Sequence, residues 1–210
     1  MPVAPTLVVL LVVACMAACG DATRDASRLR AIAKVSEGGD AKSAIRQLAP
    51  YLEQYPRDDV AWTVLGNAHE DIDQDDQAKV AYDRALQINP RRHQAVGGLG
   101  ILHRKRGEDD AAMQAYRRAL AIEPGYGPAY SSMAVIAVRQ NRDAEALEYA
   151  RKGYDLDQTD PVAAANLAVA YHYNGDTANR DRLTSRALQL GYPKGDQLRK
   201  IYDGTLTLRK

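Results

Sequence analysis

The chain has 210 residues, enough for one domain with a sizeable core. Its 28 basic and 27 acidic residues leave a formal net charge of +1, which excludes long-range attraction to nucleic acid or to an anionic membrane surface. There are 12 tyrosines, no phenylalanine and no alternating β-branched runs, so the composition predicts a helical protein whose rings lie in half-buried seams between helices.

The first twenty residues are typical of a targeting segment. Residues 7–18 (LVVLLVVACMAA) form an apolar run of signal-peptide length, shorter than the roughly 20 residues that span a bilayer. The run ends at Cys19 in MAACG, which resembles the lipobox of bacterial lipoproteins. The resemblance implies a signal peptide over 1–18, an acylated Cys19 as the first mature residue, and a polar tether over 19–27. Processing at Cys15, a plain secretory signal and an uncleaved membrane anchor are the alternatives.

Both cysteines lie in this segment, so the body of the chain has no disulfide and no thiolate metal site. Three prolines further along, Pro56, Pro90 and Pro124, recur at intervals of 34 residues. The residues of the window 59–92 that fit this register are Trp62, Leu65, Gly66, His69, Ala78, Tyr82, Ala85 and Pro90. This pattern resembles the tetratricopeptide repeat, with His69 at a position where the family has Tyr.

The same register continues along the chain. The window 93–126 repeats it with Leu99, Gly100, Tyr116 and Pro124, and weaker copies surround these two. The resemblance therefore implies an all-α fold, a right-handed α-solenoid of stacked helix–turn–helix hairpins. It covers residues 25–194 as about five repeats, at 25–58, 59–92, 93–126, 127–160 and 161–194. Residues 195–210 are expected to form a C-terminal capping helix (196–202) and a loose tail.

Two groups of polar residues have spacings that bear on metal binding. The segment 70–76 (EDIDQDD) spaces its aspartates like the start of a calcium loop, but the sixth position is Asp76 rather than Gly and the twelfth is Tyr82 rather than Glu. The segment is therefore interpreted as a solvated acidic turn. His69 and His103 stack in neighbouring repeats without a third ligand. We expect no metal site.

Catalytic motifs are absent from the sequence as well. It contains no nucleophile elbow, no HExxH and no phosphate-binding glycine loop. We therefore predict no catalytic residue and no cofactor other than the covalent lipid on Cys19. Gly97 and Gly98 lie inside a helical pattern, where glycine is costly. They indicate either close approach by the backbone of a ligand or a tolerated weakness of the helix.

In tetratricopeptide-repeat proteins the first helix of each repeat lines a concave groove. The corresponding residues here, which we predict to bind a partner, are Thr63, Asn67, Gly97, Ile101, Arg104, Ser131, Val135, Val138, Ala165 and Val169. Most are small or apolar, and basic residues lie along one rim, so we expect the groove to hold an apolar or amphipathic segment. Alternatively these residues are only repeat scaffold, and partners bind the convex side or the edges.

A lipobox followed by about five repeats resembles the pilotin and pilus-assembly lipoproteins of bacteria. The resemblance implies a non-enzymatic adaptor, lipid-anchored at the periplasmic face of the envelope, most simply in the outer membrane, that helps to assemble a pilus or a secretion secretin. Its partners would be envelope proteins and the membrane, not nucleic acid or a small-molecule substrate. The alternatives are an adaptor that regulates a periplasmic protease or a cell-wall hydrolase, and a repeat enzyme, which the lack of convergent titratable groups disfavours.

Overall fold

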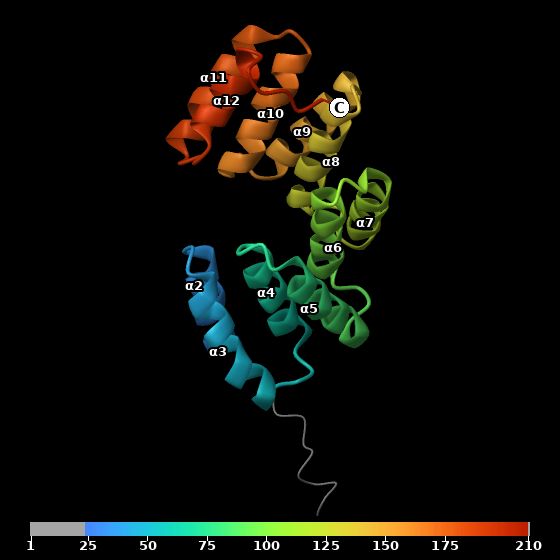
Figure 1. Cartoon of the computed structure of the whole chain (residues 1–210), viewed down its shortest axis with the longest axis vertical. Helices are drawn as coiled ribbons and strands as arrows, with labels where there is room; N and C mark the ends of the chain where they lie inside the picture. Colours follow the sequence, from blue (N-terminus) through green and yellow to red (C-terminus); the bar gives the residue numbers. More distant parts are fainter. Residues whose placement is uncertain (1–23, 210) are drawn as a thin grey trace, which may run out of the picture.

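A computed structural model describes residues 24–209 of the chain, and within them it contains eleven α-helices and no strand. The helices, labelled as in Figure 1, are α2 (Ala26–Glu37), α3 (Ala41–Gln54), α4 (Asp59–Glu70), α5 (Asp75–Ile88), α6 (His93–Lys105), α7 (Asp109–Ile122), α8 (Gly127–Arg139), α9 (Asp143–Leu156), α10 (Pro161–Tyr173), α11 (Thr177–Gln189) and α12 (Gly195–Tyr202). In the same range no helix combines the length and the apolar character needed to cross a membrane.

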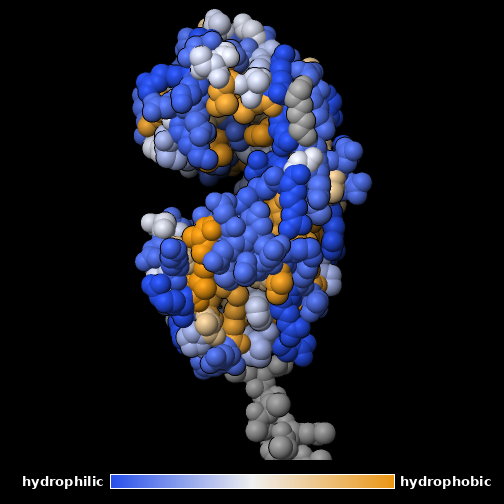
Figure 2. All heavy atoms as spheres, in the orientation of Figure 1, coloured by the Kyte–Doolittle hydropathy of each residue, from blue (hydrophilic) through white to orange (hydrophobic). Residues whose placement is uncertain are grey.

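Consecutive helices pack as hairpins, from α2 with α3 to α10 with α11, and α12 packs on α10. The first helices of successive hairpins also contact one another. Figure 1 shows that the hairpins follow each other along the long axis and curve, so that α2 and α3 face α10 to α12 across an open side. The space-filling view shows a hollow on that side (Figure 2). The prediction of an all-α solenoid of stacked hairpins is confirmed.

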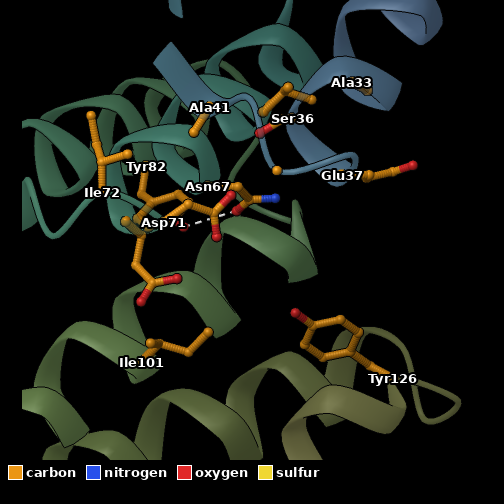
Figure 3. A pocket seen from close by; sticks show the side chains of 13 residues that line it. Ala33, Ser36, Glu37, Ala41, Asn67, Asp71, Ile72, Tyr82, Ile101 and Tyr126 are labelled. Atoms are coloured by element: carbon orange, nitrogen blue, oxygen red, sulfur yellow. Dashed lines mark hydrogen bonds between the residues drawn. The ribbon is translucent and has the colours of Figure 1, made fainter. Parts of the chain in front are cut away.

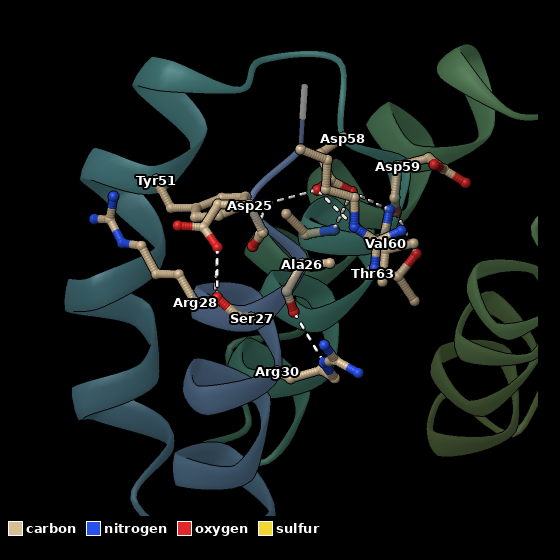
Figure 4. Close-up of polar contacts among 12 residues, drawn as sticks. Asp25, Ala26, Ser27, Arg28, Arg30, Tyr51, Asp58, Asp59, Val60 and Thr63 are labelled. Carbon is tan, nitrogen blue, oxygen red and sulfur yellow. Dashed lines mark hydrogen bonds and ion pairs between the residues drawn. The ribbon is translucent and has the colours of Figure 1, made fainter. Parts of the chain in front are cut away.

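Asp58 ties the first two hairpins together (Figure 4). One carboxylate oxygen caps α4 by accepting the backbone N–H groups of Val60 and Ala61 at 3.0 and 3.1 Å. The other accepts the hydroxyl of Tyr51, on α3, at 2.9 Å and lies 3.3 Å from Nε of Arg24. Burial, followed by the hydrogen bond to Asp58, raises the pKa of Tyr51, so the phenol remains a donor at neutral pH. One N-cap therefore joins the start of the described chain to α3 and α4.

Tyrosine rings packed against glycines join neighbouring hairpins. The ring of Tyr82 lies between Gly66 of its own hairpin and Gly98 of the next, where an added Cβ would approach its carbons to 2.4 and 2.3 Å. A Cβ on Gly97 would lie 2.6 Å from a ring carbon of Tyr126. The groups that approach Gly97 and Gly98 are aromatic rings of the chain itself, a packing reason that neither interpretation from the sequence included.

Ion pairs repeat along one edge of the solenoid. The helices α5, α7 and α9 each begin with an aspartate that pairs with a basic side chain from later in the chain. The pairs are Lys105–Asp75 at 2.7 Å, Arg139–Asp109 at 3.2 Å and Arg209–Asp143 at 2.6 Å. Lys105 and Arg139 are 34 residues apart, but Tyr173 stands at the next position of this series. The guanidinium of Arg209 instead lies 4.4 Å from the ring centroid of Tyr173 and reaches Asp143.

The tail that follows α12 is therefore not loose, contrary to the expectation from its sequence. Leu208 packs against two apolar clusters, one containing Ile201 and Val169 and the other containing Val138. The backbone N–H of Leu208 also donates to the hydroxyl of Tyr173 at 3.3 Å. The reason is that α8 and α10 offer an uncovered apolar surface at the end of the stack, and one leucine and one arginine suffice to attach the tail to it.

Candidate concave binding site

The ten predicted groove residues lie on the four first helices α4, α6, α8 and α10, but they differ in burial. Asn67 is exposed, and Ile101, Arg104 and Val135 are half-buried. The other six, which offer little surface to a partner, are Thr63, Gly97, Ser131, Val138, Ala165 and Val169. Thr63, for example, turns its hydroxyl to the backbone and donates to the carbonyl of Asp59 at 2.7 Å.

The C-terminal half of the concave face is nearly closed. A cavity of about 140 Å³ remains there, lined by Val135, Val138 and Val169 from α8 and α10 and by Ile201 and Leu208 from α12 and the tail. Ligand pockets commonly measure roughly 300–1,000 Å³, so this volume is too small for a peptide segment. The chain's own C-terminal residues cover Val138 and Val169, two of the residues that the sequence assigned to a partner.

The N-terminal half is open and contains a larger cavity, of about 620 Å³, between the α2–α3 turn, α4, α6 and the start of α8 (Figure 3). Its volume falls in the range of ligand pockets. The residues that line it are Ala33, Ser36, Glu37, Gly39, Ala41, Val64, Asn67, Glu70, Asp71, Ile72, Tyr82, Ile101 and Tyr126. Asn67 and Ile101 are the two predicted groove residues that this cavity brings together.

The cavity wall is acidic. Three carboxylates, those of Glu37, Glu70 and Asp71, belong to its lining. Burial raises the pKa of Glu70, and the charge of Lys105, whose ammonium lies 3.5 Å from the carboxylate, opposes that shift. Burial also raises the pKa of Asp71. Because desolvation disfavours the charged form of an acid, these two carboxylates are less well stabilised than they would be in water.

Two phenols complete the wall. The hydroxyl of Tyr82 donates to Oδ1 of Asn67 at 2.8 Å. Burial raises the pKa of Tyr126 to about 12, so its hydroxyl is neutral at physiological pH. The ring of Tyr126 packs edge-on against His93, with centroids 5.0 Å apart. Sequence reasoning missed Tyr126 because it precedes its helix, outside the repeat positions that carry the family pattern, and only the missing side chain of Gly97 hinted at a ring there.

The acidic segment 70–76 is held by the next repeat. Lys105 contacts Asp73 at 2.8 Å as well as Glu70 and Asp75, and Arg106 contacts Asp76 at 3.3 Å. This segment therefore takes part in packing between repeats through its charges.

The two stacked histidines close the turns of their own hairpins. Nδ1 of His69 lies 2.7 Å from Oε1 of Gln74, and Nδ1 of His103 lies 2.5 Å from Oε2 of Glu108. Across residues 24–209 no three His, Cys, Asp or Glu side chains are grouped so as to hold a metal ion. Cys19, the predicted lipidation site, lies outside the described residues.

Comparisons with known proteins agree with this architecture. The family model described as tetratricopeptide repeat matches residues 74–127. No curated protein sequence matches the chain. Among solved structures, a thermophilic tetratricopeptide-repeat protein of Thermus thermophilus is similar with a TM-score of 0.69 and 18% identity, over 85% of this chain and 96% of its own.

Two further similar structures have titles that name pilus proteins. PilF of Pseudomonas aeruginosa has a TM-score of 0.64 and 17% identity, over 85% of this chain and 84% of its own. PilW, described as a widely conserved type IV pilus biogenesis factor, has a TM-score of 0.63 and 20% identity, over 85% of this chain and 90% of its own. At these identities the likeness shows the fold.

Proposed function

We propose that this chain, a tetratricopeptide-repeat protein, is a non-enzymatic adaptor of the bacterial envelope that helps to assemble a pilus or a secretion secretin. The observation that carries the proposal is the open cavity at the N-terminal half of the concave face. Solenoids of this kind use their concave surfaces to bind other proteins, and the cavity is large enough for side chains of a bound segment.

The choice of a pilus or secretin rests on two supports. The fold is shared with PilF and with the pilus biogenesis factor PilW, whose lengths this chain matches closely. The lipobox-like sequence that ends at Cys19 is the second support, because an assembly factor for an envelope machine must be held at the membrane. The sequence placed a polar tether at 19–27, but α2 begins at Ala26. The residues between Cys19 and α2 would form a tether of no more than about 25 Å, which would keep the repeats beside the bilayer.

The partner segment would enter from the concave side and contact Ile101, Asn67 and Tyr126. Ile101 is half-buried at the floor of the cavity, so its side chain is available to a bound segment. Replacing it with glutamate would place a further negative charge among the acidic residues of the wall and abolish binding. Val80 on α5 is 66% exposed and does not line this cavity, which makes Val80→Glu the matched control.

The experiment is cross-linking in living cells followed by purification of the chain from the envelope. Four forms are compared: the natural chain, Cys19→Ser, Ile101→Glu and Val80→Glu. Capture of a secretin or a pilus subunit that is lost with Cys19→Ser and Ile101→Glu but kept with Val80→Glu supports the proposal. Capture of a periplasmic protease or a cell-wall hydrolase in its place would instead support the regulatory role. Capture that persists without Cys19 would contradict the lipid anchor.

A further inference from the structure

We infer that the open cavity on the concave face binds a basic side chain, lysine or arginine, of the partner segment. The inference rests on the proposed function, since it names the chemistry of the segment that such an adaptor would hold. It concerns the cavity bounded by α2, α4, α6 and Tyr126, and not the small closed cavity at the C-terminal end.

The first argument is the charge balance of the wall. Glu37, Glu70 and Asp71 line the cavity, and none of the described residues that line it is basic. Lys105 forms an ion pair with Glu70 of the wall. Its ammonium also lies 2.8 Å from Asp73 and 2.7 Å from Asp75, two aspartates that do not line the cavity. Within residues 24–209 no ion pair involves Glu37 or Asp71. The cavity thus has a surplus of negative charge.

The second argument is partial burial. Burial raises the pKa of both Glu70 and Asp71, and the loss of solvation is greater at Glu70, which is half-buried, whereas Asp71 and Glu37 are exposed. A cation that enters the cavity would restore favourable interactions to carboxylates that are already partly desolvated, so less solvation remains to be lost on binding.

The third argument is an acceptor without a partner. The hydroxyl of Tyr126 faces the cavity and makes no hydrogen bond within the described part of the chain (Figure 3). A guanidinium or ammonium group that enters the cavity could donate to this oxygen as well as to a carboxylate of the wall. Asn67 keeps its amide in place through the hydroxyl of Tyr82.

The remaining wall is apolar and suits the stem of a long basic side chain. Ala33, Val64, Ile72 and Ile101 contribute hydrocarbon surface beside the carboxylates. Lysine and arginine commonly bury their methylene groups against such surface while the charged end reaches polar partners. A negatively charged terminus of a peptide would instead meet three carboxylates, which disfavours binding.

The test uses the full chain, purified in detergent and immobilised, and a library of synthetic 12-residue peptides. In each pool one central position is fixed as arginine, lysine, norleucine or glutamate, and the other positions are random. We expect the arginine and lysine pools to be retained about tenfold more than the norleucine pool, and the glutamate pool least. The double variant Glu37→Gln/Asp71→Asn should bring the ratio of basic to norleucine pools close to one.

The matched control is Asp76→Asn, which removes a charge from the same acidic turn. The Asp76 side chain is 93% exposed and does not line the cavity, so this variant should keep the preference for basic pools. An unaltered helical circular dichroism spectrum would show that each variant is folded. Equal retention of all pools, retention of none, or equal loss in Asp76→Asn and in the double variant would overturn the inference.

This outcome can be separated from the fate of the proposed function. Selection of basic pools without capture of a secretin or pilus subunit in cells would support the basic-side-chain site and contradict the assembly role. Capture of such a subunit without any preference among the pools would support the assembly role and contradict the basic-side-chain site.

Discussion

The ring of Tyr82 occupies the space in which Gly98 would otherwise carry a side chain, since an added Cβ would lie 2.3 Å from the ring's Cζ. The ring is only 1% exposed, and Gly66 touches it from the other side. Tyr82 belongs to α5, and Gly98 belongs to α6 of the next hairpin. The contact therefore lies at a seam between repeats, where each hairpin depends on its neighbour for burial.

Replacing Gly98 with alanine should destabilise the protein although alanine favours helix. The intrinsic preference would contribute about 1 kcal/mol in favour of Gly98→Ala. Overpacking against a ring that cannot move costs about 1–3 kcal/mol, so we expect a net loss in the free energy of unfolding. Urea denaturation measures it.

Gly125→Ala serves as the control for this substitution. Gly125 is exposed, and the nearest atom to an added Cβ is a carboxylate oxygen of the flexible Glu123 side chain at 3.2 Å. Its free energy of unfolding should change little. A Gly98→Ala chain as stable as the natural one would show that the seam can widen around the ring.

Lys105 should contribute more to stability than an ordinary surface lysine. Its side chain is 25% exposed and bridges three carboxylates of the preceding repeat, whereas Lys152 is 51% exposed and pairs with Glu148 on its own helix. We expect Lys105→Met to lower the free energy of unfolding by about 1 kcal/mol more than Lys152→Met, because removing Lys105 leaves Glu70, Asp73 and Asp75 to repel each other.

This difference should shrink in high salt, which screens the repulsion. Denaturation of both variants at low and at high ionic strength tests the idea. Equal losses for the two lysines at low ionic strength would mean that the acidic turn is stable without its partner.

The stability conferred by Asp176 should depend on pH. Asp176 caps α11 and accepts hydrogen bonds from the side-chain amide and the backbone N–H of Asn179, at 2.7 and 3.0 Å. These bonds lower the pKa of Asp176 from its ordinary value of 3.8. A depressed folded-state pKa gives stability that is present above the ordinary value and is lost as the pH falls through the folded value.

Asp176→Ala should therefore lower the melting temperature at pH 7. The gap from the natural chain should close as the pH falls below 3.8. Asp155→Ala, which removes an exposed carboxylate from α9, is the comparison variant and should show a smaller gap at neutral pH. A gap for Asp176→Ala that stays constant across this range would assign its effect to something other than the carboxylate charge.

Arg209 and Asp143 should be energetically coupled although 66 residues separate them. Their side chains are 35% and 29% exposed, so the pair is partly shielded from solvent. We expect a coupling of about 1 kcal/mol between Arg209→Ala and Asp143→Ala in a double-mutant cycle followed by urea denaturation. The pair formed by Arg199 and Asp196 on the exposed face of α12 supplies a reference cycle, which should show a smaller coupling. Additive effects at Arg209 and Asp143 would mean that Leu208, and not the ion pair, attaches the tail to the stack.

The repeat architecture was predictable because it depends on contacts that recur. Pro56, Pro90 and Pro124 precede α4, α6 and α8, and the small residues between them recur at the same intervals because every hairpin solves the same packing problem. Gly100, for instance, accommodates the ring of Tyr116 just as Gly66 accommodates that of Tyr82. Packing contacts that recur in every hairpin require the same types of residue at the same spacing, and that spacing can be recognised in the sequence.

The binding surface was predictable only in part, because the contacts that cover or open it are made by residues outside the repeat pattern. Val138 and Val169 occupy groove positions of the repeat, yet Leu208 and α12 cover them. Nothing in the sequence of the tail, TLTLRK, repeats an earlier pattern or marks it as ordered. Tyr126 likewise enters the open cavity from a turn residue, and its place follows from the curvature of the solenoid rather than from the repeat.

The position of Arg209 has a consequence for how long the stack can be. At Tyr173 the series that began with Lys105 and Arg139 lacks its next basic residue, and the last aspartate of the series is satisfied from the tail instead. A further hairpin grafted after residue 194 would have to displace the tail before it could dock on α10, and it would find Asp143 already neutralised. Leu208 and Arg209 thus occupy the surface on which a further hairpin of the same kind would pack, so the tail competes with repeat extension at this position.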